Sequence, residues 1–263
     1  MRPYAAIFAS RFQTMLQYRA ATAAGIATQV FWGLVRSMIF DAFYTSSSGP
    51  HPLTHDQAIT YIWLGQALLL ITMLNVDADV AAMIRSGSVA YEMTRPLDLY
   101  TSWFVRALSG RAAPLIMRSI PIFAISGLFF GLTAPASPGA GMLFLFSALG
   151  GLLTSASLIA LLTISLLWTI SGEGISRLAP GLVFVFSGIL VPIPLLPNWV
   201  QSVAAILPFR GLIDTPFRIY MGQLSGTAAT TALLFQVAWL IALVILGRMA
   251  LARGVRRLVV QGG

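Results

Sequence analysis

The chain has 263 residues, of which 57% are hydrophobic and 9% are charged, and its formal net charge is +8. Soluble domains carry about 25% charged residues, so this composition excludes a water-soluble protein and indicates one that is surrounded by lipid. All 16 basic residues are arginine, and cysteine is absent. A P-loop needs a lysine that reaches the nucleotide phosphates, which excludes a standard nucleotide-hydrolysing site, and disulfides and thiolate sites are excluded as well.

The first segment, residues 3–18, is too polar to lie in hydrocarbon. However, Tyr4, Phe8, Phe12 and Met15 recur along it at helical spacing. The pattern predicts an amphipathic helix that lies on the inner face of a membrane. The alternative is a short solvent-exposed segment that precedes the first span.

Six long apolar runs follow. Runs of about 17–25 apolar residues can cross a bilayer as helices, and they are much longer than barrel strands. The sequence therefore predicts an all-α membrane protein with one transmembrane domain over residues 1–263. The expected spans are 20–43, 58–74, 112–132, 139–170, 178–196 and 228–250.

The arginines are unevenly distributed between the two sides of this predicted topology. With both termini in the cytoplasm, 13 of the 16 lie on the inner side, Arg210 and Arg218 lie outside, and Arg36 lies within a span. Such a bias is the positive-inside signature. Because the basic residues flank apolar spans, attraction to anionic membrane lipids explains them better than nucleic-acid binding does. The inner set is Arg2, Arg11, Arg19, Arg85, Arg95, Arg106, Arg111, Arg118, Arg177, Arg248, Arg253, Arg256 and Arg257.

The predicted cytoplasmic connector, residues 75–111, contains charged residues of both signs together with tyrosine and tryptophan. Gly87 indicates a helix end after Arg85, residues 89–93 fit a short strand or a helical turn, and Arg95-Pro96 breaks the chain before a new helix near 97–109. A structured inner loop of this kind is typical of a docking surface. The alternative is a solvated connector whose arginines only set the topology.

The segment after the fifth span is rich in proline but not properly polar. Pro192, Pro194 and Pro197 stop a helix because proline lacks an amide donor, and apolar helical pieces carrying Trp199 and Phe209 follow. Non-helical backbone at membrane depth is tolerated only when it is buried in protein or lines a cavity. This predicts one or two short re-entrant helices that form an outer gate. The alternative is an interfacial helix anchored by Trp199 and Tyr220.

Three charges fall within predicted spans: Arg36, Asp41 and Arg118. Intramembrane charges suggest function, but snorkelling to the interface explains them equally well. His51 and His55 lie four residues apart in an outer loop, and we interpret them as loop residues and not as metal ligands. No metal site is expected.

The order of these features resembles an ABC-2-type transporter permease. The segment Gly87-Ser-Val-Ala-Tyr-Glu-Met-Thr-Arg-Pro-Leu-Asp-Leu-Tyr100 is similar to a "G…YEL.RPLD.Y" stretch of one bacterial branch of that family. The resemblance implies a plasma (inner) membrane protein that pairs with a second permease, a heterodimer being favoured, and with separate ABC ATPase subunits that bind ATP and Mg. It also implies that the 75–111 connector contributes a helix that couples to the ATPase. The residues at or near this contact would be Arg85, Gly87, Tyr91, Glu92, Arg95, Pro96 and, from the next inner loop, Glu173, for which a local pair with Arg177 is the alternative.

The predicted function is therefore a non-catalytic permease subunit of an ATP-driven exporter. The alternative is a secondary transporter or channel that works without ATP. Such a protein usually shows related halves and ion-coordinating groups at the midplane, and the sequence shows neither. A membrane enzyme is disfavoured because no Ser-His-Asp or paired-carboxylate set can be assembled. The substrate class stays open among lipids, glycolipids, amphiphilic drugs and peptides.

Overall fold

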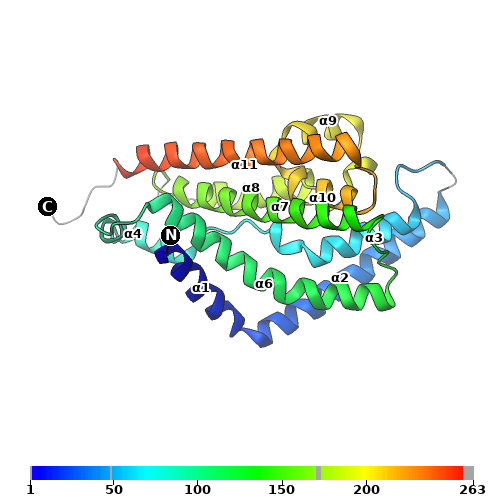
Figure 1. Ribbon diagram of the computed structural model, residues 1–263, viewed down its shortest axis with the longest axis horizontal. Coiled ribbons are helices and arrows are strands. Elements are labelled where there is room, and N and C mark those ends of the chain that lie inside the picture. Colours follow the sequence, from blue (N-terminus) through cyan, green and yellow to red (C-terminus); the bar gives the residue numbers. More distant parts are fainter. Residues whose placement is uncertain (1, 48, 170–172, 257–263) are drawn as a thin grey trace.

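The computed structural model describes residues 2–47, 49–169 and 173–256, and within these ranges it contains helices and no strand. The long helices run along the longest axis of the molecule (Figure 1). Helices α1 and α4 lie at one end, together with the N-terminus, and α9 and α10 lie toward the other. We call these the α4 end and the α9 end. The helices, in chain order, are α1 (Arg2–Leu16), α2 (Arg19–Ser46), α3 (His55–Ala67), η1 (Leu69–Ile71), α4 (Ala78–Arg85), α5 (Val89–Met93), α6 (Leu99–Phe129), α7 (Pro138–Ser165), α8 (Glu173–Phe186), η2 (Ile193–Leu195), α9 (Asn198–Ile206), η3 (Pro208–Leu212), α10 (Asp214–Tyr220) and α11 (Gly226–Val255).

Four helices among the described residues are long and apolar enough to cross a membrane: α2, α6, α7 and α11. They correspond to the first, third, fourth and sixth predicted spans. Helix α6 starts at Leu99 and continues through Pro114 and Pro121, so the helix expected near residues 97–109 and the third predicted span form one helix. Neighbouring helices in a bundle tolerate such prolines, because they can satisfy the freed backbone groups.

The second predicted span is not one continuous helix. Helix α3 has 13 residues and is followed by the short 3₁₀ helix η1. Side chains of neighbouring helices bind the carbonyl groups at the end of α3: the Gln29 amide donates to the oxygen of Gln66 at 2.9 Å, and the Ser119 hydroxyl donates to that of Ala67 at 2.7 Å. The orphan carbonyls of a helix end thus find partners inside the bundle.

The fifth predicted span, 178–196, is also interrupted. Helix α8 ends at Phe186, and Gly188 adopts a φ of +87°. Pro192 then precedes the 3₁₀ helix η2, and Pro194 lies within it. The helix stops about ten residues earlier than the sequence predicted, because the left-handed glycine ends it before the prolines are reached.

The helix predicted for the first segment forms as α1, and its position on the inner face of a membrane stays a prediction. Its aromatic stripe faces α6: Phe8 and Phe12 stack with ring centroids 5.6 Å apart and pack against the main core. The Tyr4 hydroxyl accepts a hydrogen bond of 2.8 Å from the backbone N–H of Asp98. Helix α1 is therefore bound to the protein by the same stripe that predicted it.

The core is built around α7, which carries small residues where η3 packs against it. A Cβ added to Gly151 would lie 3.1 Å from the carbonyl oxygen of Leu212. Gln236 of α11 donates to the carbonyl oxygens of Ser147 and Gly211 at 2.7 and 2.8 Å. These contacts hold η3 and α10 inside the protein.

The two residues proposed as interfacial anchors lie in different environments. Tyr220 is buried, and its hydroxyl donates to the carbonyl oxygen of Thr133 at 2.8 Å. Trp199 of α9 is 69% exposed. Tyr220 is thus a core residue and not a surface anchor, so only Trp199 can act in that way.

Candidate partner-docking site

Helices α4 and α5 form a compact unit at the α4 end. Asp77 caps α4 by accepting hydrogen bonds from the backbone N–H groups of Asp79 and Val80 at 3.0 and 3.2 Å. Gly87 ends the helix with a φ of +71°, a conformation that glycine adopts without steric cost. The predicted glycine stop is therefore confirmed, and residues 89–93 form a helical turn and not a strand.

One ion-pair cluster connects this unit to α1. Nη1 of Arg11 lies 2.9 Å from a carboxylate oxygen of Asp77, and its Nη2 binds Asp79. Because both carboxylates stand at the start of α4, they also interact favourably with the positive end of the helix dipole. Arg11 thus fastens the N-terminal helix to the first turn of α4.

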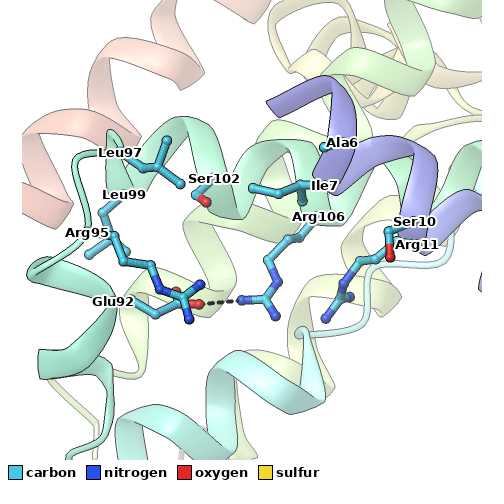
Figure 2. A pocket seen from close by; sticks show the side chains of 10 residues that line it. All are labelled: Ala6, Ile7, Ser10, Arg11, Glu92, Arg95, Leu97, Leu99, Ser102 and Arg106. Carbon is cyan, nitrogen blue, oxygen red and sulfur yellow. Dashed lines mark hydrogen bonds and ion pairs between the residues drawn. The ribbon is translucent and has the colours of Figure 1, made fainter. Parts of the chain in front are cut away.

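A second cluster connects the unit to α6. Glu92 accepts a bond of 2.8 Å from Arg106 and one of 3.1 Å from the indole N–H of Trp103. The side chains of Glu92 and Arg106 are only 15% and 19% exposed, so their pairing is weakly screened by water. Figure 2 shows Glu92 and Arg106 facing one another beneath α1. Short helix α5 is therefore attached to the long helix α6.

Between these two clusters lies a groove of about 380 Å³. Arg11, Arg95 and Arg106 bring three positive charges to its walls, and Glu92 brings one negative charge (Figure 2). The hydroxyls of Ser10 and Ser102, together with apolar side chains such as Ile7 and Leu97, complete the lining. The groove is thus suited to a polypeptide segment that carries both an acidic and an apolar side chain.

Most of the predicted contact residues are exposed in the segment that contains α4 and α5. Arg85, Arg95 and Pro96 are exposed, and Tyr91 is 76% exposed. Glu92 differs from them because its carboxylate is bound within the protein. Glu173 begins α8, but its side chain lies outside the described residues.

Sequence reasoning missed the partners that hold this surface in place. Asp77 and Trp103 were not singled out, and Arg11 and Arg106 were noted only as part of the inner set of arginines. Asp77 carries a local signal, since an aspartate before an apolar run is typical of a helix start. The pairing of Arg11 with Asp77, 66 residues apart, has no local signal.

A comparison with protein families matches residues 53–262 to the model described as "ABC-2 family transporter protein". The chain belongs to the ABC-2 transporter family. No curated protein matched it in a separate search. The family match confirms the resemblance drawn from residues 87–100 and makes the chain a multi-pass membrane permease of the ABC type. It begins after α1 and α2, so Arg11 lies outside the matched part.

In this ABC-2 family protein, the three charges predicted within spans do not converge on one site. Arg36 of α2 binds the backbone oxygens of Ile189 and Leu190, just beyond α8. Arg118 of α6 lies against Gly25 of α2 and reaches the Ala21 oxygen at 3.5 Å. Asp41 pairs with His55 at 2.5 Å. Arg36 and Asp41 are thus bound by nearby groups, whereas Arg118 makes one long contact and its Nε has no hydrogen-bond partner within the described part of the chain.

A further charged cluster lies near the residues proposed for an outer gate. Asp214 is fully buried, and its carboxylate lies 3.7 Å from both Arg210 and Arg218. The Tyr61 hydroxyl donates to it at 3.5 Å. Pro192 is buried, Pro194 and Phe209 are half-buried, and Pro197 and Trp199 are exposed. The residues proposed for the gate therefore differ in burial and do not form a single polar site. Among the described residues, no group of histidines and carboxylates could hold a metal ion.

Proposed function

We propose that this chain is the permease subunit of an ATP-driven exporter. It forms half of the transmembrane pathway beside a second permease, a heterodimer being favoured. Separate ATPase subunits, which bind ATP and Mg, drive it. Family membership supports the transporter class, and the absence of lysine, which a P-loop requires, supports hydrolysis by a partner.

The ATPase subunit would dock on the α4 end, on the surface formed by Arg85, Tyr91, Met93 and Arg95. This assignment rests on one observation. Glu92, which follows the exposed Tyr91 in α5, attaches α5 to α6 through its bonds to Trp103 and Arg106. A displacement of Tyr91 would move a 31-residue helix that can cross the membrane. Coupling requires such an element, whose conformation both nucleotide and substrate bias.

The membrane topology follows from this assignment. The α4 end would face the cytoplasm of a bacterial cell and the α9 end would face outward, with α3 and α8 completing six passes across the inner membrane. The segment from Ser187 to Tyr220 would be the re-entrant outer gate. Deep burial of residues 208 and 211–217 supports this, since irregular backbone at membrane depth must be covered by protein.

The alternative is an ATP-independent secondary transporter or channel. One observation favours it: a fully buried carboxylate, Asp214, is the type of residue that couples ions to transport. Its two arginine neighbours compensate the charge, however, which suits a fixed structural cluster better than an ion site.

Replacing Tyr91 and Arg95 together by alanine is expected to weaken recovery of the ATPase subunit about tenfold or more, since truncating central interface residues costs about 1–2 kcal/mol each. Both side chains are exposed, so insertion and thermal stability should be unchanged. The measurement is quantitative co-purification from membranes in which the ATPase is co-expressed.

The matched control is Tyr18→Ala with Arg19→Ala, which removes an exposed tyrosine and arginine away from α5. Equal recovery of the ATPase by both variants would contradict the docking assignment. Transport by the purified chain in proteoliposomes without nucleotide would instead establish the alternative.

A further inference from the structure

We propose that a cleft at the α9 end binds a lipophilic cation, meaning a positively charged centre on an apolar body. The cleft has a volume of about 340 Å³ and lies between α2, α3 and the end of α6. Small-molecule sites typically measure about 300–1,000 Å³. The inference rests on the proposed function, because the bound molecule would then be of the transported class.

The inner part of the cleft is apolar and aromatic. Trp63 and Phe130 stack with ring centroids 4.9 Å apart and an interplanar angle of 9°. Leu34, Met38 and Ile59 form the walls around them. Trp63 is only 1% exposed and is held against Gly33, where an added Cβ would lie 2.5 Å from its ring. Phe130, which is half-buried and stacked on the rigid Trp63, is therefore the aromatic ring that the cleft can present to an apolar body and a nearby cation.

The rim of the cleft is acidic in an otherwise strongly basic chain. Two of the eight acidic residues of the protein, Asp41 and Asp56, stand there. No arginine is among the described residues that line the cleft. The local charge thus favours a positive ligand although the protein as a whole carries +8.

His55 already fills the place of a cation between these carboxylates. Its Nε2 lies 2.5 Å from Asp41 and its Nδ1 lies 3.4 Å from Asp56. The hydrogen bond to Asp41 raises the pKa of His55 above its ordinary value of 6.5. The rim can thus hold a positive group, and a ligand cation would compete with the imidazolium for the same oxygens.

Two buried polar atoms of the cleft residues have no hydrogen-bond partner in the described part of the chain: the hydroxyl oxygen of Ser37 and the indole nitrogen of Trp63. Buried donors left without partners are costly. An occupant that carries an acceptor atom beside its cationic centre would satisfy both donors.

The same charges argue against a membrane phospholipid as the occupant. Even a zwitterionic headgroup would bring its phosphate next to Asp41 and Asp56, and like charges at this distance repel. A cation without a phosphate meets only the attractive part of the site. The proposal therefore commits to a lipophilic cation.

Tetraphenylphosphonium and tetraphenylborate provide a matched test, because they have the same shape and opposite charges. Equilibrium dialysis would measure their binding to the chain alone, in phosphatidylcholine nanodiscs, with empty nanodiscs subtracted. We expect the cation to bind at least about tenfold more tightly than the anion. One favourable ion pair at a partly exposed site can change the Kd by about this factor.

Asp41→Asn with Asp56→Asn is expected to weaken binding of the cation about three- to tenfold, the range of one or two partly exposed ion pairs. His55→Ala is expected to tighten binding, because it frees both carboxylates. The charge-matched control is Asp79→Asn with Asp98→Asn at the opposite end, which should leave binding unchanged. Thermal unfolding of each variant verifies that it is folded.

Equal binding of the two ions would overturn the proposal, as would a double asparagine variant that binds like its control. If the asparagine variant does not fold, failure of His55→Ala to tighten binding decides against the site. The test uses no ATPase, so a positive result without ATPase co-purification would refute the proposed function and leave the cation site standing.

Discussion

Gly188→Ala is expected to lower the free energy of unfolding by about 3 kcal/mol. About 1–2 kcal/mol comes from placing a side chain at a left-handed φ, here +87°. The remainder, about 1–3 kcal/mol, comes from overpacking, because the new Cβ would collide with the hydroxyl of Tyr61. The measurement is thermal or denaturant unfolding in detergent.

Gly181→Ala, in helix α8 seven residues before Gly188, provides the control. No atom lies within 4 Å of a Cβ at that position, so alanine should be neutral or stabilise the helix by up to about 1 kcal/mol. Adding Tyr61→Phe to Gly188→Ala should recover part of the lost stability by removing the hydroxyl. Equal unfolding temperatures for the Gly188 and Gly181 variants would show that the chain does not make this turn.

Asp214→Asn is expected to destabilise the protein by about 3 kcal/mol. Breaking a buried ion pair leaves charge without compensation, at a cost of about 3–5 kcal/mol, and the partial exposure of Arg210 and Arg218 reduces that cost. The mutation keeps the shape of the side chain, so the change in unfolding free energy reports mainly the charge. Unfolding in detergent measures it.

The exposed pair of Asp98 with Arg248 gives the comparison. Their side chains are 38% and 53% exposed, so Asp98→Asn should change stability by no more than about 1 kcal/mol. Adding Arg218→Gln to Asp214→Asn should restore part of the loss, which a double-mutant cycle would detect. Equal losses from the Asp214 and Asp98 variants would mean that the cluster contributes nothing beyond a surface pair.

Much of the fold was predictable from local pattern. The aromatic spacing of residues 4–15 located α1, Gly87 located the end of α4, and four apolar runs located the long helices. Each of these features depends on the period of the helix or on the conformational freedom of one residue. Such properties act over a few residues, so they can be read without knowing what lies opposite.

The limits of α6 and α3 were predicted less well. The sequence predicted a helix near 97–109 and a span from 112, whereas α6 is one helix that runs from Leu99 through Pro114 and Pro121. Conversely, α3 stops at Ala67, where Ser119 of α6 and Gln29 of α2 reach the carbonyls near its end. Whether a helix continues thus depends on whether neighbouring helices satisfy its backbone groups.

For the candidate docking surface, the sequence indicated residues 85–96 but not what supports them. Tyr91 and Arg95 lie exposed as a docking surface requires, whereas Glu92 is turned inward onto Arg106 and Trp103. A carboxylate on a short amphipathic turn can face either way. The buried arginine and indole donors of α6 determine its direction, because an unpaired donor there would be costly.

By itself, the sequence determined that this protein is surrounded by lipid, that it is helical, and that a helix ends near Gly87, because composition and local stereochemistry are properties of short stretches. Only the tertiary structure decided which charges meet. Arg11 with Asp77, Arg36 with the end of α8, and Asp214 with its two arginines all follow from packing. In a low-dielectric interior each charge must find a partner, and that partner is determined by helix contacts between residues far apart in the chain.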